Sequence, residues 1–107
     1  PKALDAAAHA AIADGAPTPV PIITPRFVPT CSSELMHGLG KLAKEHDLLV
    51  QTHISENKDE VAWVKELHPD CDSYAATYDA HGLLRRGTLL AHGVYLTMPE
   101  LELIKAK

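Results

Sequence analysis

The sequence predicts an α/β protein in which parallel strands alternate with helices. Three short apolar runs, PIIT at 21–24, LLVQTHI at 48–54 and TLLAHG at 88–93, are typical of buried strands. Stretches with helical spacing of apolar residues lie between them. Parallel neighbours cannot be joined by two-residue turns, so strands that alternate with crossover helices indicate parallel pairing.

The first predicted helix is the alanine-rich stretch 2–14, which Gly15 is placed to terminate. A proline-rich connector, GAPTPVP at 15–21, leads to the first strand. Either Ser32 or Ser33 can cap a second helix that runs to about His46.

The remaining helices are marked by their caps. Asn57 and Glu60 have the spacing of a capping box, and the helix they open ends before Pro69. Residues 70–84 are ambiguous and fit a short helix followed by a loop. Thr97 and Glu100 form a second capping box at the start of a last helix.

Composition narrows the class of protein. The 107 residues are 46% hydrophobic, enough for one domain at most. A net charge of −4 without a Lys/Arg cluster argues against a nucleic-acid partner. The apolar runs are too short to cross a membrane and no signal peptide is evident, so we expect a soluble, cytoplasmic protein with Cys31 and Cys71 reduced. The chain starts at Pro1 and stops within a helical pattern at Lys107, which leads us to expect a piece of a longer protein.

Chemically active residues follow the predicted strands. Arg26 comes after the first strand, His53 and Glu56 end the second, and His92 ends the third. Parallel α/β folds carry their active sites at the carboxyl ends of strands, so we expect these residues to face one rim.

Strand alternation assigns faces to these residues. Leu49, Gln51 and His53 should share one face, while Val50, Thr52 and Ile54 should meet the covering helices. By the same rule Leu90 and His92 should share a face.

Histidine at such a rim suits a metal site. Its neutral ring nitrogen can bind Zn²⁺, and Glu56, three residues after His53, could act as a proton shuttle. A histidine at a strand end is, however, more often a hydrogen-bonded structural residue, so the residues alone leave both readings open. Cys31 is expected to be a bystander and Trp63 a packing residue. The other histidines are predicted to be solvated surface residues: His9, His37, His46, His68 and His81.

Together, the motifs resemble one family. The chain contains ITPRF followed by C-S-x-E-L-M, then HISE with N-x-D-E-V, then AHG-x-Y-L. This combination, from Pro21 to about Leu103, resembles the guanine deaminases of the amidohydrolase superfamily. The resemblance implies a partial (β/α)8 TIM barrel of the metal-dependent hydrolase type with zinc at its mouth. Residues 1–107 would supply roughly the fourth strand to the start of the sixth helix of that single catalytic domain.

The resemblance also implies roles. His53 would be a zinc ligand and Glu56 the catalytic acid and base. His92 would be catalytic by orienting the hydrolytic water or, in two-metal relatives, would bind a second ion. Arg26 and Phe27 would bind the purine, with His53 and Glu56 also lining the substrate site. The implied reaction is hydrolytic deamination of guanine to xanthine and ammonia.

Some family features are missing from the sequence. The HxH pair of the first strand and the aspartate of the eighth are absent, although a catalytic zinc needs about three or four protein ligands. A typical barrel also needs about 250 residues. We therefore expect the remaining ligands in a longer parent enzyme, for which a homodimer is left open, and an inactive isolated segment.

Two rival functions remain open at this stage. One is another amidohydrolase that acts on an amino-substituted purine, pyrimidine or triazine ring. The other is a non-catalytic α/β binding module whose histidines are structural.

Overall fold

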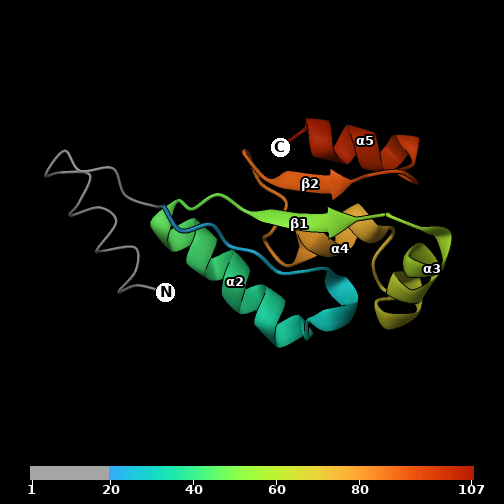
Figure 1. Cartoon of the computed structure of the whole chain (residues 1–107), viewed down its shortest axis with the longest axis horizontal. Helices are drawn as coiled ribbons and strands as arrows, with labels where there is room; N and C mark the ends of the chain where they lie inside the picture. The colour runs from blue at the N-terminus through green and yellow to red at the C-terminus, as the bar shows by residue number, and fades with distance from the viewer. Residues whose placement is uncertain (1–19) are drawn as a thin grey trace, which may run out of the picture.

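The computed structural model describes residues 20–107, and Figure 1 shows how their helices and strands are arranged. The elements are η1 (Val28–Thr30), α2 (Ser33–His46), β1 (Gln51–Ile54), α3 (Lys58–Leu67), α4 (Tyr74–Ala80), β2 (Leu89–His92) and α5 (Met98–Lys105). The helix predicted at 2–14, His9 and most of the 15–21 connector lie outside the described residues.

The two strands confirm the predicted parallel pairing. β1 pairs with β2 in a register that runs from Gln51 opposite Leu89 to Ile54 opposite His92. Both arrows in Figure 1 point toward the end of the molecule where α3 lies. The carboxyl ends of the strands therefore meet on one rim.

The strand predicted at 21–24 is reduced to a single bridge, between Ile23 and Val50. Ile23 donates to the carbonyl of Leu49 (3.0 Å) and accepts from the amide of Gln51 (2.9 Å). Pro21 and Pro25 lie two residues before and after Ile23, where the next ladder donors of a parallel strand would be needed. Because proline has no N–H, the ladder cannot extend.

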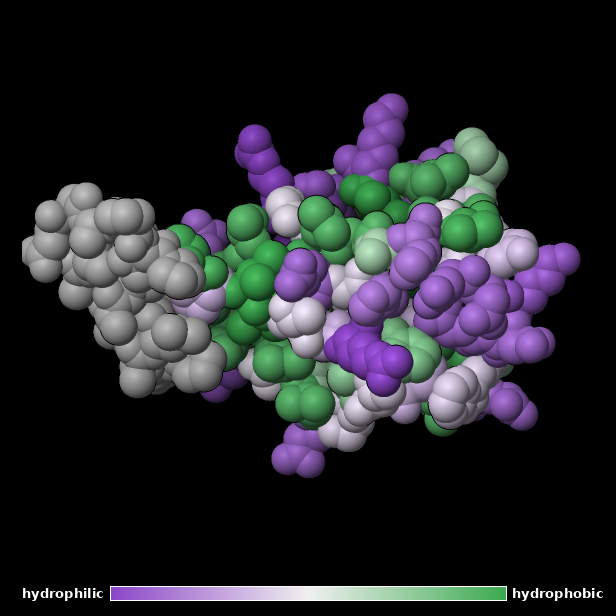
Figure 2. Space-filling model, in the orientation of Figure 1, coloured by the Kyte–Doolittle hydropathy of each residue, from purple (hydrophilic) through white to green (hydrophobic). Residues whose placement is uncertain are grey.

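The alternation predicted for β1 is confirmed. Val50, Thr52 and Ile54 are buried against the helices, whereas Leu49 on the opposite face is 56% exposed. In Figure 1, α4 lies behind β1, and its Tyr78 hydroxyl reaches Thr52 on the buried face (2.8 Å). Figure 2 shows hydrophobic residues across the middle of the visible face and hydrophilic residues gathered at the end to which the strands point.

The cap residues of the helices agree with the sequence, but the capping box predicted at Asn57 and Glu60 is not formed, because Glu60 accepts from the amide of Glu56 instead. The side chains of Ser32 and Asn57 accept from the third amide of α2 and α3, and Thr97 with Glu100 completes both bonds of its capping box. The ambiguous region contains α4, which Ser73 caps. Within residues 20–107, no helix has the length and hydrophobicity that crossing a bilayer requires.

His81 is buried, and its prediction as a solvated residue was wrong. Its Nδ1 lies 2.7 Å from the carbonyl of Thr77, and its Nε2 lies 2.7 Å from the Ser33 hydroxyl. The rings of His37 and His68 lie against it, with centroid distances of 4.3 and 5.5 Å. His81 was misassigned because it follows α4, a helix that the sequence left ambiguous.

The other histidines predicted to lie on the surface differ in how exposed they are. His37 is exposed, as expected, although its ring contacts His81. His46 and His68 are half-buried.

A close approach of two backbones joins α2 to the turn after α4. A Cβ added to Gly40 would overlap the carbonyl oxygen of His81. A Cβ on Gly38, in the same helix, would meet nothing within 4 Å. Only the first of these glycines is therefore required by packing.

We predict opposite effects for alanine at these two glycines. Gly38→Ala should raise the free energy of unfolding by about 0.5–1 kcal/mol, because alanine loses less backbone entropy in a helix. Gly40→Ala should lower it by about 1–3 kcal/mol, because the added methyl group displaces the turn at His81. Urea unfolding measures both, and equal changes would contradict the close approach.

We also predict a pH dependence from His81. Burial lowers its pKa below the ordinary value, so the unfolded state binds the proton more readily than the folded state. The free energy of unfolding should therefore fall as the pH drops below about 6.5, the pKa expected of an unfolded histidine. In His81→Gln this fall should be smaller, as measured by urea unfolding at pH 8 and pH 5.5. If His81→Gln has the pH dependence of the wild type, the loss of stability at low pH comes from other groups.

Candidate active site

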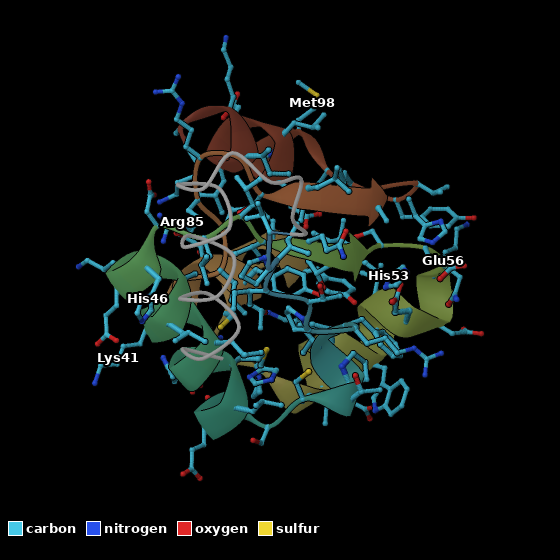
Figure 3. The ribbon with its side chains drawn as sticks, turned by 60° about the vertical axis from the view of Figure 1, so that its left-hand side comes forward. Lys41, His46, His53, Glu56, Arg85 and Met98 are labelled. Carbon is cyan, nitrogen blue, oxygen red and sulfur yellow. The ribbon has the colours of Figure 1, made fainter. Side chains whose placement is uncertain are left out.

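The rim at the carboxyl ends of the strands brings the predicted site residues together. Figure 3 shows His53 and Glu56 on the same side of the molecule, away from Lys41, His46 and Arg85. A small hollow of about 80 Å³ opens there. Its lining residues are Arg26, Phe27, His53, Glu56 and Glu60.

The backbone amide and the ring of His53 are both held by one carbonyl group, that of Arg26. This oxygen accepts from the backbone amide of His53 (3.2 Å) and lies 2.7 Å from Nδ1 of its ring. A carbonyl can only accept, so Nδ1 carries a proton, and the neutral ring leaves a lone pair on Nε2. This is the arrangement in which a histidine ligates a metal through Nε2.

His92 reaches the same place through a left-handed backbone. Its φ is 77°, and its ring stacks on that of His53 with centroids 5.4 Å apart and planes 20° apart. The prediction that it shares a face with Leu90 was wrong, because Leu90 packs against the core instead. The positive φ departs from the extended alternation on which that prediction relied.

Glu56 stands next to His92. Its Oε2 lies 3.7 Å from Nε2 of His92, and its side chain is half exposed. Ser55, between His53 and Glu56, is left-handed at φ 51° and accepts from the amide of Tyr95 (3.2 Å). The reversal at Ser55 turns the chain from the strand toward α3.

Arg26 and Phe27 form the other wall. The guanidinium carbon of Arg26 lies 5.5 Å from the centroid of the Phe27 ring. The Trp63 ring meets Phe27 edge to face, with centroids 6.5 Å apart. Trp63 was expected to be a packing residue, yet it is 48% exposed and borders a hollow together with Glu56.

Sequence reasoning missed the buried polar groups beneath the rim. The Tyr78 hydroxyl donates to the carbonyl of His53 (2.7 Å), and the Tyr74 hydroxyl donates to Oε1 of Glu60 (3.0 Å). Burial raises the pKa of Tyr78 to about 12 and also raises that of Tyr74, so both remain proton donors at neutral pH. The i, i+4 spacing of the tyrosines in YAATY is the signal that could have revealed them.

The described residues do not form a complete metal site by themselves. Within residues 20–107, no cluster of three or more His, Cys, Asp or Glu side chains could hold a metal ion. The lone pair on Nε2 of His53 fits one zinc ligand, which is less than the three or four protein ligands of a complete site.

Comparison with known proteins assigns the chain to a family. The fold and rim define an α/β protein of parallel strands with histidine and carboxylate side chains at their carboxyl ends. The chain belongs to the amidohydrolase family, whose model matches residues 3–107.

Its relatives include guanine deaminases, so the predicted resemblance is confirmed. The guanine deaminase of Dictyostelium discoideum is 47% identical over 96 residues, which cover 90% of this chain and 21% of the relative. The human guanine deaminase is 51% identical over 82 residues, covering 77% of this chain and 18% of the relative.

A solved structure is similar as well. The crystal structure of guanine deaminase from C. acetobutylicum with bound guanine in the active site has a TM-score of 0.79 and 52% identity. The match covers 81% of this chain and 21% of that one. The chain thus spans about a fifth of the length of these relatives.

Proposed function

We propose that this chain forms part of a zinc-dependent guanine deaminase that hydrolyses guanine to xanthine and ammonia. The observation that carries the proposal is the gathering of His53, Glu56 and His92 on one rim beside Arg26 and Phe27. Support also comes from the identity of about half to guanine deaminases, one of which has guanine bound in its active site. In this proposal residues 1–107 belong to one (β/α)8 barrel.

His53 would supply one metal ligand through Nε2, because Nδ1 is committed to the Arg26 carbonyl. The remaining ligands would lie outside residues 20–107. When bound, Zn²⁺ lowers the pKa of a coordinated water to about 7.

Glu56 would move the protons. Its carboxylate accepts one proton from the attacking water and delivers it to the ring nitrogen, and it then takes the second proton from the hydroxyl group on the tetrahedral carbon and delivers it to the departing amine. A C–O bond forms at the amino-bearing carbon, the C–N bond breaks, and ammonia leaves. His92, 3.7 Å from Glu56, would orient the water and stabilise negative charge on its oxygen.

Arg26 and Phe27 would hold the substrate. A guanidinium donates in-plane hydrogen bonds to a carbonyl oxygen or ring nitrogen, as found on guanine. The Phe27 ring can pack on the face of the purine. These two neighbours in the sequence would therefore recognise an edge and a face of the same ring.

We predict that Glu56→Gln in the complete protein retains zinc but loses guanine turnover by about 10²- to 10⁴-fold, because glutamine cannot accept the proton. Zinc is measured by atomic absorption and turnover by xanthine formation. Glu66→Gln, an exposed glutamate of α3, is the control and should keep its turnover. Near-normal turnover of Glu56→Gln would remove Glu56 from the proposed role.

We predict that Arg26→Ala raises the KM for guanine by about 10- to 100-fold, the effect of losing hydrogen bonds from a charged donor. Arg86→Ala, which removes an exposed arginine elsewhere on the chain, is the control. Steady-state kinetics with guanine measure the KM of both variants. If Arg26→Ala has the KM of the control, Arg26 does not hold the substrate.

A further inference from the structure

Glu60 has a buried carboxylate directly beneath the candidate site. Glu60 is 6% exposed although it lies in the first turn of α3, where an acid could remain in water. Its Oε2 accepts from the backbone amide of Glu56 (2.7 Å), and its Oε1 accepts from the Tyr74 hydroxyl (3.0 Å). Burial of a carboxylate is unfavourable unless such donors replace water, so this position is specified by its partners.

Helix capping alone does not explain where Glu60 points. In a capping box the acid at this position returns to the amide of the cap residue, which here is Asn57. Glu100 does this in α5, where its carboxylate accepts from the amide of Thr97 (3.1 Å). Glu60 instead reaches one residue further back, to Glu56, while Asn57 caps α3 with its own side chain.

The amide held by Glu60 completes a series of restraints on the H-I-S-E segment. The Tyr78 hydroxyl holds the carbonyl of His53, and the amides of Gly93 and Tyr95 hold the carbonyls of Ile54 and Ser55. At Glu56 the restraint is the carboxylate of Glu60. Without it, the peptide group after the left-handed Ser55 could rotate and carry the Glu56 side chain away from His92.

We propose that Glu60 is a positioning residue that fixes the backbone of Glu56 and thereby keeps the Glu56 carboxylate beside His92. This inference rests on the proposed function, because it assigns the role of Glu60 through the acid and base of that reaction. Tyr74 supports the same contact by holding the second oxygen of Glu60.

The first experiment compares two buried glutamates in the complete, zinc-loaded protein. Glu60→Ala should lower kcat for guanine by about 10- to 100-fold with KM and zinc content retained, since displacing a catalytic group by about 1 Å has effects of this size. Glu100→Ala removes a carboxylate that is similarly buried but completes the capping box of its own helix, α5. It should lose stability but keep kcat. Equal kcat values in the two variants would overturn the proposal.

A conservative variant separates position from charge. Glu60→Gln keeps an oxygen that can accept from the Glu56 amide, so its kcat should lie well above that of Glu60→Ala. Tyr74→Phe leaves Glu60 in place and removes one of its two donors. We expect a decrease in kcat of about two- to tenfold, the effect of one hydrogen bond. If Glu60→Ala does not fold, a wild-type kcat in Tyr74→Phe would overturn the proposal.

Hydrogen exchange at the Glu56 amide tests the contact without using activity. Exchange at this amide, resolved by NMR, should be faster in Glu60→Ala and Tyr74→Phe than in the wild type, and unchanged in Glu100→Ala. Wild-type protection of the Glu56 amide in both Glu60→Ala and Tyr74→Phe would overturn the proposal. A wild-type protein that does not deaminate guanine would instead refute the proposed function, while the exchange result would still decide whether Glu60 holds Glu56.

Discussion

The carbonyl oxygen of Arg26 is the acceptor on which the candidate site depends. It receives the amide of His53, faces the protonated Nδ1 of the same residue, and lies 3.3 Å from the Thr52 hydroxyl. The contact joins the segment after the Ile23 bridge to the end of β1 and fixes the tautomer of His53 at the same time. A backbone carbonyl cannot donate or ionise, so the lone pair on Nε2 persists wherever the ring is neutral. The proposed ligation of a metal by His53 would therefore follow from main-chain geometry.

A second layer of buried hydroxyl and carboxylate groups supports this arrangement. Thr52, Tyr74, Tyr78 and Glu60 are all buried, and each makes a hydrogen bond to another member of the group or to the backbone of the H-I-S-E segment. Apolar residues of similar size would pack as well but would leave the His53 carbonyl and the Glu56 amide without these partners. Such buried polar contacts restrict the backbone to one conformation, because an unpaired polar group in the interior is unfavourable by about 1–3 kcal/mol. Their contribution is therefore to the geometry of the rim more than to stability.

Features with a local cause could be read from the sequence, and features with a non-local cause could not. The caps at Ser32, Asn57 and Thr97 depend on residues within one turn, and the alternation of β1 depends on a period of two. The direction of His92 could not be predicted, because its positive φ is a property of the junction between β2 and the following turn. The burial of His81 and Glu60 depends on partners 48 and 14 positions away, namely Ser33 and Tyr74. That the candidate site residues meet could be predicted, because parallel strands place their carboxyl ends on one side. The residues that hold them in place could not be predicted.

On the face of the sheet opposite the helices, the side chains change from apolar to polar toward the rim, in agreement with the proposed barrel. Leu49 and Leu89, 56% and 60% exposed, lie near the amino ends of the strands, and Gln51 and His53 follow on the same face toward the rim. In a (β/α)8 barrel this face is the interior, which side chains fill in layers, with catalytic groups in the layer at the carboxyl ends. Gln51 lies opposite Leu89 and His53 opposite Ala91, so these four side chains would all face the interior of the proposed barrel. The small Ala91 side chain beside His53 leaves room for a ring to stack there, and the left-handed turn at His92 provides one. In the proposed barrel, the exposed leucines would fill the base of the interior and the stacked histidines would lie at its mouth.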